Sequence, residues 1–66
     1  MTRKMLMNQM NRGLDPQELQ FEAYREGGDH VIAMWRPNKQ VRVTLAYAKS
    51  WAAARTQAYQ ALAMVA

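Results

Sequence analysis

The chain has 66 residues, half of them hydrophobic, and carries nine lysines and arginines against five acidic residues, for a net charge of +4. A chain of this length forms one small domain that buries roughly 60% of its unfolded surface, so a thin core is expected and an enclosed catalytic pocket is not. The absence of cysteine and the single histidine exclude disulfides, thiolate metal sites and histidine clusters. No apolar run is long enough for a membrane-spanning helix. We therefore predict one soluble, cytoplasmic domain over residues 1–66, with no cofactor and no metal.

The charges are segregated along the chain. All five acidic residues lie between Asp15 and Asp29, whereas residues 30–66 carry five basic residues and no acidic one. The first fourteen residues add three more basic side chains. A surface of one sign attracts polyanions over a long range that depends on salt. The pattern favours a nucleic-acid partner, and its structural alternative is a basic surface that serves solubility alone.

The first predicted element is a short amphipathic helix near the N-terminus. Thr2 can cap its first turn, and Gly13 marks its end. Its apolar side chains recur at roughly helical spacing. They are Met5, Leu6, Met10 and Leu14. A helix this short is marginal alone, so we expect it to pack against the rest of the domain.

Three strands joined by tight turns are predicted next. Residues 19–24 alternate between apolar and polar side chains, as a half-buried strand does. Residues 30–36 are rich in β-forming side chains, and residues 40–45 give the clearest alternation. Residues 27–29 and 37–39 contain the glycines, proline and asparagine that are typical of turns. This arrangement predicts an antiparallel meander.

A longer helix is predicted at the end of the sequence. Ser50 is its expected N-cap, and seven of the fifteen residues from Ala52 to Ala66 are alanine, the strongest helix former. The stripe expected to face the sheet consists of Trp51, Ala54, Ala58, Ala61, Leu62 and Val65. The predicted fold is therefore α+β, in the order αβββα, with two helices packed on one face of a three-stranded antiparallel sheet.

This order and several local strings resemble the double-stranded-RNA-binding domain over roughly residues 4–63. Arg12-Gly13-Leu14, a proline-containing loop and then Phe21 resemble the end of that family's first helix and the start of its first strand. Residues 27–30 resemble its histidine-bearing turn, and Ser50 followed by alanines at helical spacing resembles its second helix. The resemblance implies a non-catalytic module that binds structured or double-stranded RNA by shape and phosphate contacts.

The resemblance also implies three contact regions on the RNA. The first helix lays polar side chains into one minor groove, the histidine-bearing turn reaches a second, and the start of the second helix contacts phosphates across the major groove between them. The matching residues are Asn8 and Asn11, with Gln9 as an alternative, in the first region, Gly28 and His30 in the second, and Lys49, Ser50 and Arg55 in the third.

A second hypothesis starts from departures from the family pattern. Trp51 and Ala52 stand where the family has the first two lysines of its second helix, and Gly28 replaces the usual proline of the histidine turn. The fold would then be a protein-interaction module that has lost RNA binding, such as a phage-encoded inhibitor of a host protein. An exposed Trp51 and the methionine-rich first helix would carry the contact, or would form a homodimer. The candidate partner-binding residues are Trp51, Met5, Met7, Arg36 and Arg42.

A third hypothesis is DNA binding through the sheet. Three strands followed by a helix, from Phe21 to Leu62, also resemble plant ethylene-response-factor-type and integrase arm-binding DNA domains, whose strands enter the major groove. The sheet face opposite the second helix would then be basic, with Arg25, Arg36 and Arg42 prominent. The structural alternative is that these charges protect the edge strands against association.

Several of the candidates also have a purely structural interpretation. Trp35 and Trp51 are expected in the core or at its rim. His30 has no partner residues for metal binding and no neighbouring nucleophile for general-base catalysis. The acidic residues are spread along an extended segment. We therefore predict that the protein is not an enzyme.

Overall fold

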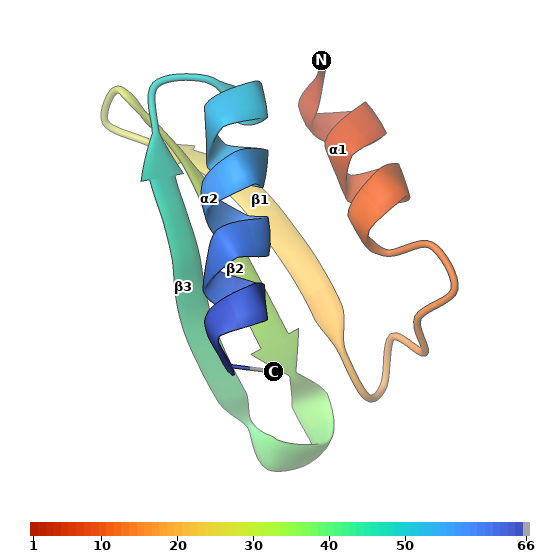
Figure 1. The fold of residues 1–66 in the computed structure, drawn as a ribbon. Coiled ribbons are helices and arrows are strands. Elements are labelled where there is room, and N and C mark those ends of the chain that lie inside the picture. Colours follow the sequence, from red (N-terminus) through yellow and green to blue (C-terminus); the bar gives the residue numbers. More distant parts are fainter. Residues whose placement is uncertain (66) are drawn as a thin grey trace.

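A computed structural model describes residues 1–65, with side chains through residue 64 (Figure 1). Its elements are α1 (Arg3–Met10), β1 (Gln20–Glu26), β2 (Asp29–Arg36), the short 3-10 helix η1 (Pro37–Lys39), β3 (Val41–Ala48) and α2 (Trp51–Val65). The strands form one antiparallel sheet in the order β1-β2-β3, and both helices pack on the same face of it. The predicted αβββα order and the α+β class are confirmed.

The helix-facing side of the sheet is made largely of small side chains. Ala46 and Ala48 of β3 and Ala54 and Ala58 of α2 are all buried in one cluster. Because alanine extends only one carbon from the backbone, α2 can approach the sheet closely. Ile32 of the central strand is fully buried in the same cluster. The predicted inward stripe of α2 is confirmed at Ala54 and Ala58 and at Trp51 and Leu62, which pack against the cluster; Ala61 is half-buried, and the side chain of Val65 lies outside the described residues.

α1 covers the β1 side of the same face. The hydroxyl of Thr2 accepts a hydrogen bond from the Met5 amide at 3.1 Å, which confirms the predicted N-cap. Leu6 and Met10 are buried, but Met5 is 61% exposed, so Met5 does not belong to the buried stripe of this helix although it shares its apolar spacing. The reason is angular: Leu6 and Met10 are four residues apart on one face, and Met5 falls beside it.

A β-bulge interrupts the pairing of β2 with β3. Ile32 pairs with Ala46 but Ala33 pairs with Thr44, so Leu45 is the extra residue. The bulge shifts the side-chain alternation of β3 by one position, so that Ala46 and Ala48 face the helices. Val41 and Val43 lie near the η1 end of the β2–β3 hairpin and remain about two-fifths exposed (42% and 41%). The strand itself was predicted correctly, but the apolar alternation of residues 41–45 does not define its buried positions.

No helix in the described part of the chain combines the length and the hydropathy needed to cross a membrane.

The turn from β2 to β3 contains a strained position. Gln40 follows η1 with a φ of 51°, the left-handed region, and its amide donates to the carbonyl of Pro37 at 3.2 Å. A residue with a Cβ pays about 1–2 kcal/mol in this conformation, whereas glycine does not.

We predict that Gln40→Gly stabilises the protein by about 0.5–1 kcal/mol, since relief of the strain exceeds the entropy that glycine adds to the unfolded chain. Urea unfolding measures the change. Lys39→Gly is the matched control, because Lys39 has no positive φ, and it should destabilise by about 0.5–1 kcal/mol. Equal losses in both variants would contradict the assignment of strain to Gln40.

Candidate nucleic-acid interface

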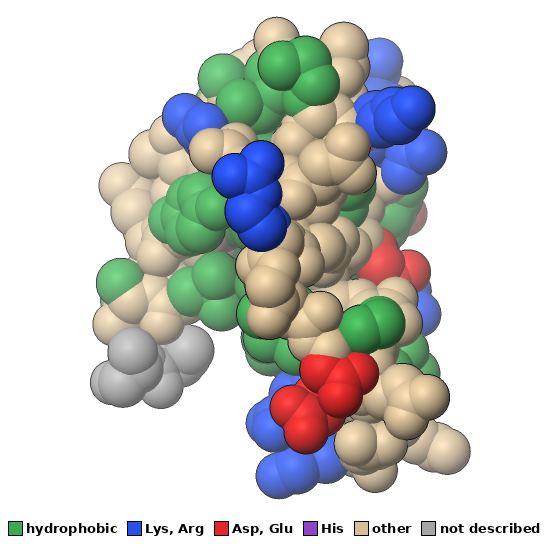
Figure 2. Space-filling view, turned by 90° about the vertical axis from the view of Figure 1, so that its right-hand side faces the viewer, with side chains coloured by type: hydrophobic (Ala, Val, Ile, Leu, Met, Phe, Trp, Pro, Cys, Tyr) green, Lys and Arg blue, Asp and Glu red, His purple; other side chains and the backbone are tan. Residues whose placement is uncertain are grey.

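The two helices form a layer that carries charges of one sign. Neither α1 nor α2 contains an acidic residue. The basic residues of this layer and its flanks are Arg3, Lys4, Arg12, Lys49 and Arg55. Figure 2 shows the side of the molecule on which α1 faces the viewer: basic side chains occupy the upper and central parts of this side, and acidic side chains lie at its lower end and right-hand edge with further basic side chains beside them. The two helices are therefore free of acidic side chains, whereas the rest of the surface carries charges of both signs.

A groove runs between α1 and α2, and we refer to it as the helix groove. The guanidinium of Arg55 donates to the side-chain oxygen of Gln9 at 3.2 Å and so joins the two helices. Two hollows, of about 510 and 610 Å³, meet at these two residues. The smaller hollow is lined by Met1, Met5, Asn8, Gln9, Arg12 and Arg55. The larger hollow is lined by Gln9, Arg55, Thr56, Tyr59, Gln60 and Ala63. Neither hollow has a carboxylate in its wall.

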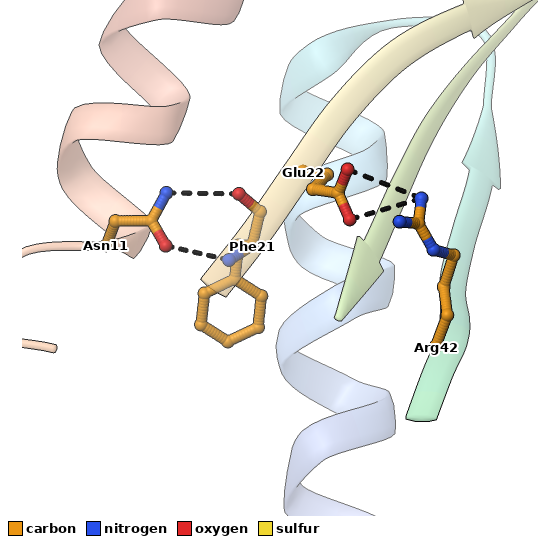
Figure 3. Close-up of polar contacts among 4 residues, drawn as sticks. All are labelled: Asn11, Phe21, Glu22 and Arg42. Carbon is orange, nitrogen blue, oxygen red and sulfur yellow. Dashed lines mark hydrogen bonds and ion pairs between the residues drawn. The ribbon is translucent and has the colours of Figure 1, made fainter. Parts of the chain in front are cut away.

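The side chain of Asn11 has a structural use. Its amide nitrogen donates to the carbonyl of Phe21 at 3.1 Å, and its oxygen accepts from the Phe21 amide at 2.7 Å (Figure 3). Arg3 adds a bond to the carbonyl of Ala23 at 3.2 Å. Together these bonds fasten α1 to the outer edge of β1. The sequence suggested Asn11 as an RNA-contacting residue, but both ends of its amide are already engaged, whereas Asn8 is exposed in the groove wall.

Trp51 and His30 pack against each other. Their ring centroids lie 4.7 Å apart at 87°, an edge-to-face contact, and both residues are half-buried. Trp51 also packs against the core cluster, as the sequence predicted. His30 Nδ1 is buried and has no hydrogen-bond partner among the described residues. The ring of His30 is thus held at the base of the β1–β2 turn, and Trp51 is not the exposed anchor that the protein-interaction hypothesis required.

The start of α2 combines a cap and an exposed cation. The hydroxyl of Ser50 accepts from the Ala53 amide at 3.1 Å, so the predicted N-cap is confirmed. The ammonium of Lys49 lies 2.8 Å from a carboxylate oxygen of Asp29, next to the β1–β2 turn. An exposed pair of this kind is worth at most about 1 kcal/mol. Lys49 can therefore exchange Asp29 for another anion at little cost.

The three arginines of the DNA-binding hypothesis do not lie together on the open face of the sheet, the face opposite the helices. One guanidinium nitrogen of Arg42 lies 3.2 and 3.3 Å from the two carboxylate oxygens of Glu22, with hydrogen-bond geometry to Oε2 (Figure 3). The guanidinium also lies 5.1 Å from the ring centroid of Trp35. Arg25 lies on the same side of β1 as the buried Ala23, and Arg36 lies on the same side of β2 as the buried Ile32. Both arginines are therefore on the side of the sheet that bears the core. The open face therefore carries one neutralised arginine.

Two groove residues were missed as candidate site residues in the sequence. Arg12 follows the candidate Asn8 by four residues, and Tyr59 follows the candidate Arg55 by four. At this spacing, each lies on the same side as the earlier candidate. That spacing was the available signal. The sequence did not show that the residues of α1 and those of α2 would face each other across one groove.

No protein-family model, curated protein or solved structure matches the chain. The described residues contain no group of three or more histidine, aspartate or glutamate side chains placed to hold a metal ion. The case for a function therefore depends on the charge and shape of the helix layer.

We predict that Asn11→Ala lowers the free energy of unfolding by about 1–3 kcal/mol, because the amide of Phe21 loses its partner in a partly buried position. Asn8→Ala is the matched control and should change stability by less than about 0.5 kcal/mol, since Asn8 is exposed. Urea unfolding of both variants is the measurement. Equal changes would show that the bonds to Phe21 contribute nothing.

Proposed function

We propose that the protein is a non-catalytic, cytoplasmic module that binds structured or double-stranded RNA through its helix layer. The observation that carries the proposal is that every charged side chain on the two packed helices is basic. A partner with many regularly spaced negative charges is complementary to such a layer, and a phosphate backbone has that property.

The positions of the basic side chains fit a nucleic-acid phosphate backbone that crosses both helices. Arg12 and Arg55 line the same hollow of the helix groove, and Lys49 lies at the start of α2. The carboxylates near these cations are few: Asp29 contacts Lys49, while Asp15 and Glu18 follow Arg12 in the loop at the C-terminal end of α1. A polyanion on this layer would meet attraction along most of its length.

Duplex RNA suits the arrangement better than duplex DNA. The β1–β2 turn and the start of α2 lie at one end of the domain, and α1, which carries Asn8 and Gln9, lies beside α2 (Figure 1). These are the three regions that the resemblance to the double-stranded-RNA-binding domain implicates. A-form RNA has a shallow minor groove with 2′-hydroxyls and a deep major groove bordered by phosphates, so it is read by shape from such separated points. Asn8 and Gln9 supply exposed polar groups for the minor groove.

A protein partner is the second candidate, and exposed methionines favour it. Met1 and Met5 are more than half exposed in the wall of the smaller hollow. Adaptable methionine side chains are common on protein-binding surfaces. An interface centred on them would depend weakly on salt, whereas RNA binding depends on it steeply. The two candidates are therefore separable by one titration.

We predict that the protein binds an RNA duplex more tightly than a matched DNA duplex or single-stranded RNA, with an affinity that falls steeply between two salt concentrations. Arg12→Gln and Arg55→Gln should each reduce the slope of log K against log salt by about one unit. Arg42→Gln is the control, because Arg42 is paired with Glu22 on the opposite face. Fluorescence anisotropy of labelled duplexes measures both quantities.

A greater loss in Arg42→Gln than in Arg12→Gln would instead favour binding through the sheet. Failure to bind any of the three nucleic acids at low salt would exclude the proposal and leave the protein partner.

We also predict that Asp29→Asn raises RNA affinity by roughly two- to fivefold, because it removes the carboxylate 2.8 Å from Lys49 and leaves that cation to the phosphates. Glu18→Gln is matched in charge but lies in the loop at the far end of α1, and should change affinity less. The same anisotropy titration compares them. An equal gain in both variants would mean that only net charge matters, and that Lys49 makes no local contact.

A further inference from the structure

We propose that the larger hollow of the helix groove receives a single unstacked nucleotide of the bound RNA, such as a one-nucleotide bulge. This inference rests on the proposed function, since it assumes that the helix layer binds RNA. It goes further by assigning the partner: a duplex interrupted by an extruded base, in preference to a perfect one.

The hollow is a shallow depression that is open to solvent, and of its six lining residues only Gln9 comes from α1. Its volume of about 610 Å³ includes space that is open to solvent, so it suits a ligand that stays partly exposed. It is open to solvent between two helices, so a base can enter from the surface without rearrangement of the backbone. Tyr59 and Ala63 supply apolar surface, and Gln9 and Gln60 supply polar groups.

Tyr59 is the expected stacking partner for the base. Its side chain is 45% exposed and lies in the wall of the hollow. Unstacked bases in RNA are recognised by stacking on aromatic rings and by hydrogen bonds to their edges. The amide of Gln60, one residue further along α2, has both a donor and an acceptor for such an edge. Thr56 is less suited to this role, because its hydroxyl already donates to the carbonyl of Ala52 at 3.2 Å.

Arg55 is placed to hold the phosphate of the extruded nucleotide. It stands where the two hollows meet, it is half-buried, and its guanidinium is held by Gln9 at 3.2 Å. A side chain that is already ordered loses less entropy when it binds. Arg12 lines the adjoining hollow and is available for the neighbouring phosphate. The lining is therefore cationic in the middle, aromatic on one side and free of carboxylates, which complements a nucleotide more closely than an apolar peptide.

The test compares two RNA duplexes that differ by one unpaired adenosine, each titrated with the wild-type protein, Tyr59→Ala and Tyr47→Ala. Tyr47 is the matched control, since it is 52% exposed but lies on β3, on the open side of the sheet. We expect the wild-type protein to bind the bulged duplex about tenfold more tightly than the perfect one. Tyr59→Ala should abolish this preference by lowering the affinity for the bulged duplex much more than the affinity for the perfect one, while Tyr47→Ala should preserve it.

A second readout does not depend on the folding of the alanine variant. With 2-aminopurine in place of the unpaired adenosine, stacking on Tyr59 should change its fluorescence on addition of wild-type protein or Tyr59→Phe, which keeps the ring. Equal binding of the two duplexes with no fluorescence change would overturn the inference and leave the proposed function intact. An equal loss for both duplexes in Tyr59→Ala would also overturn it. Failure to bind either duplex would overturn both proposals.

Discussion

The close approach of α2 to the sheet is the constraint on which the rest of the structure depends. Ala54 and Ala58 on the helix meet Ala46 and Ala48 on the sheet, and all four are buried. A domain of 66 residues has little apolar surface to bury, so contact between small side chains replaces the thick core of a larger protein. The bulge in β3 is part of the same arrangement, because it turns Ala46 and Ala48 towards the helix. A larger side chain at any of the four positions would lift α2 and widen the helix groove.

The division of charge between the two sides of the molecule follows from this packing. The two helices carry basic side chains and no carboxylate, whereas the sheet carries both signs and two of its carboxylates are paired with basic residues. Glu22 neutralises Arg42 on the open face, and Asp29 holds Lys49 at the border between the two sides. The helix layer thereby offers a surface without carboxylates, which would orient a polyanion that bound there.

The sequence was informative wherever a local rule decides the structure. Capping by Thr2 and Ser50, the two turns and the alanine stripe of α2 depend on neighbours within a few residues, and the structure confirms them. Long-range contacts could not be predicted in this way. The bond between Asn11 and Phe21 joins residues ten apart in the sequence. From the sequence alone, the same asparagine could equally be an exposed surface residue. Likewise, the groove exists only because tertiary packing brings the Gln9 and Arg55 stripes together.

The paired bonds of Asn11 to Phe21 also have a consequence for how the molecules behave among themselves. A carboxamide side chain offers a donor and an acceptor as a peptide group does, so Asn11 serves as a one-residue mimic of a fourth strand at the edge of β1. An unpaired edge is a template on which strands of other molecules can add and begin to aggregate. With that position occupied from within the chain, β1 cannot offer Phe21 to a neighbour. At Phe21, this edge of the sheet is therefore closed to the addition of a strand from another molecule.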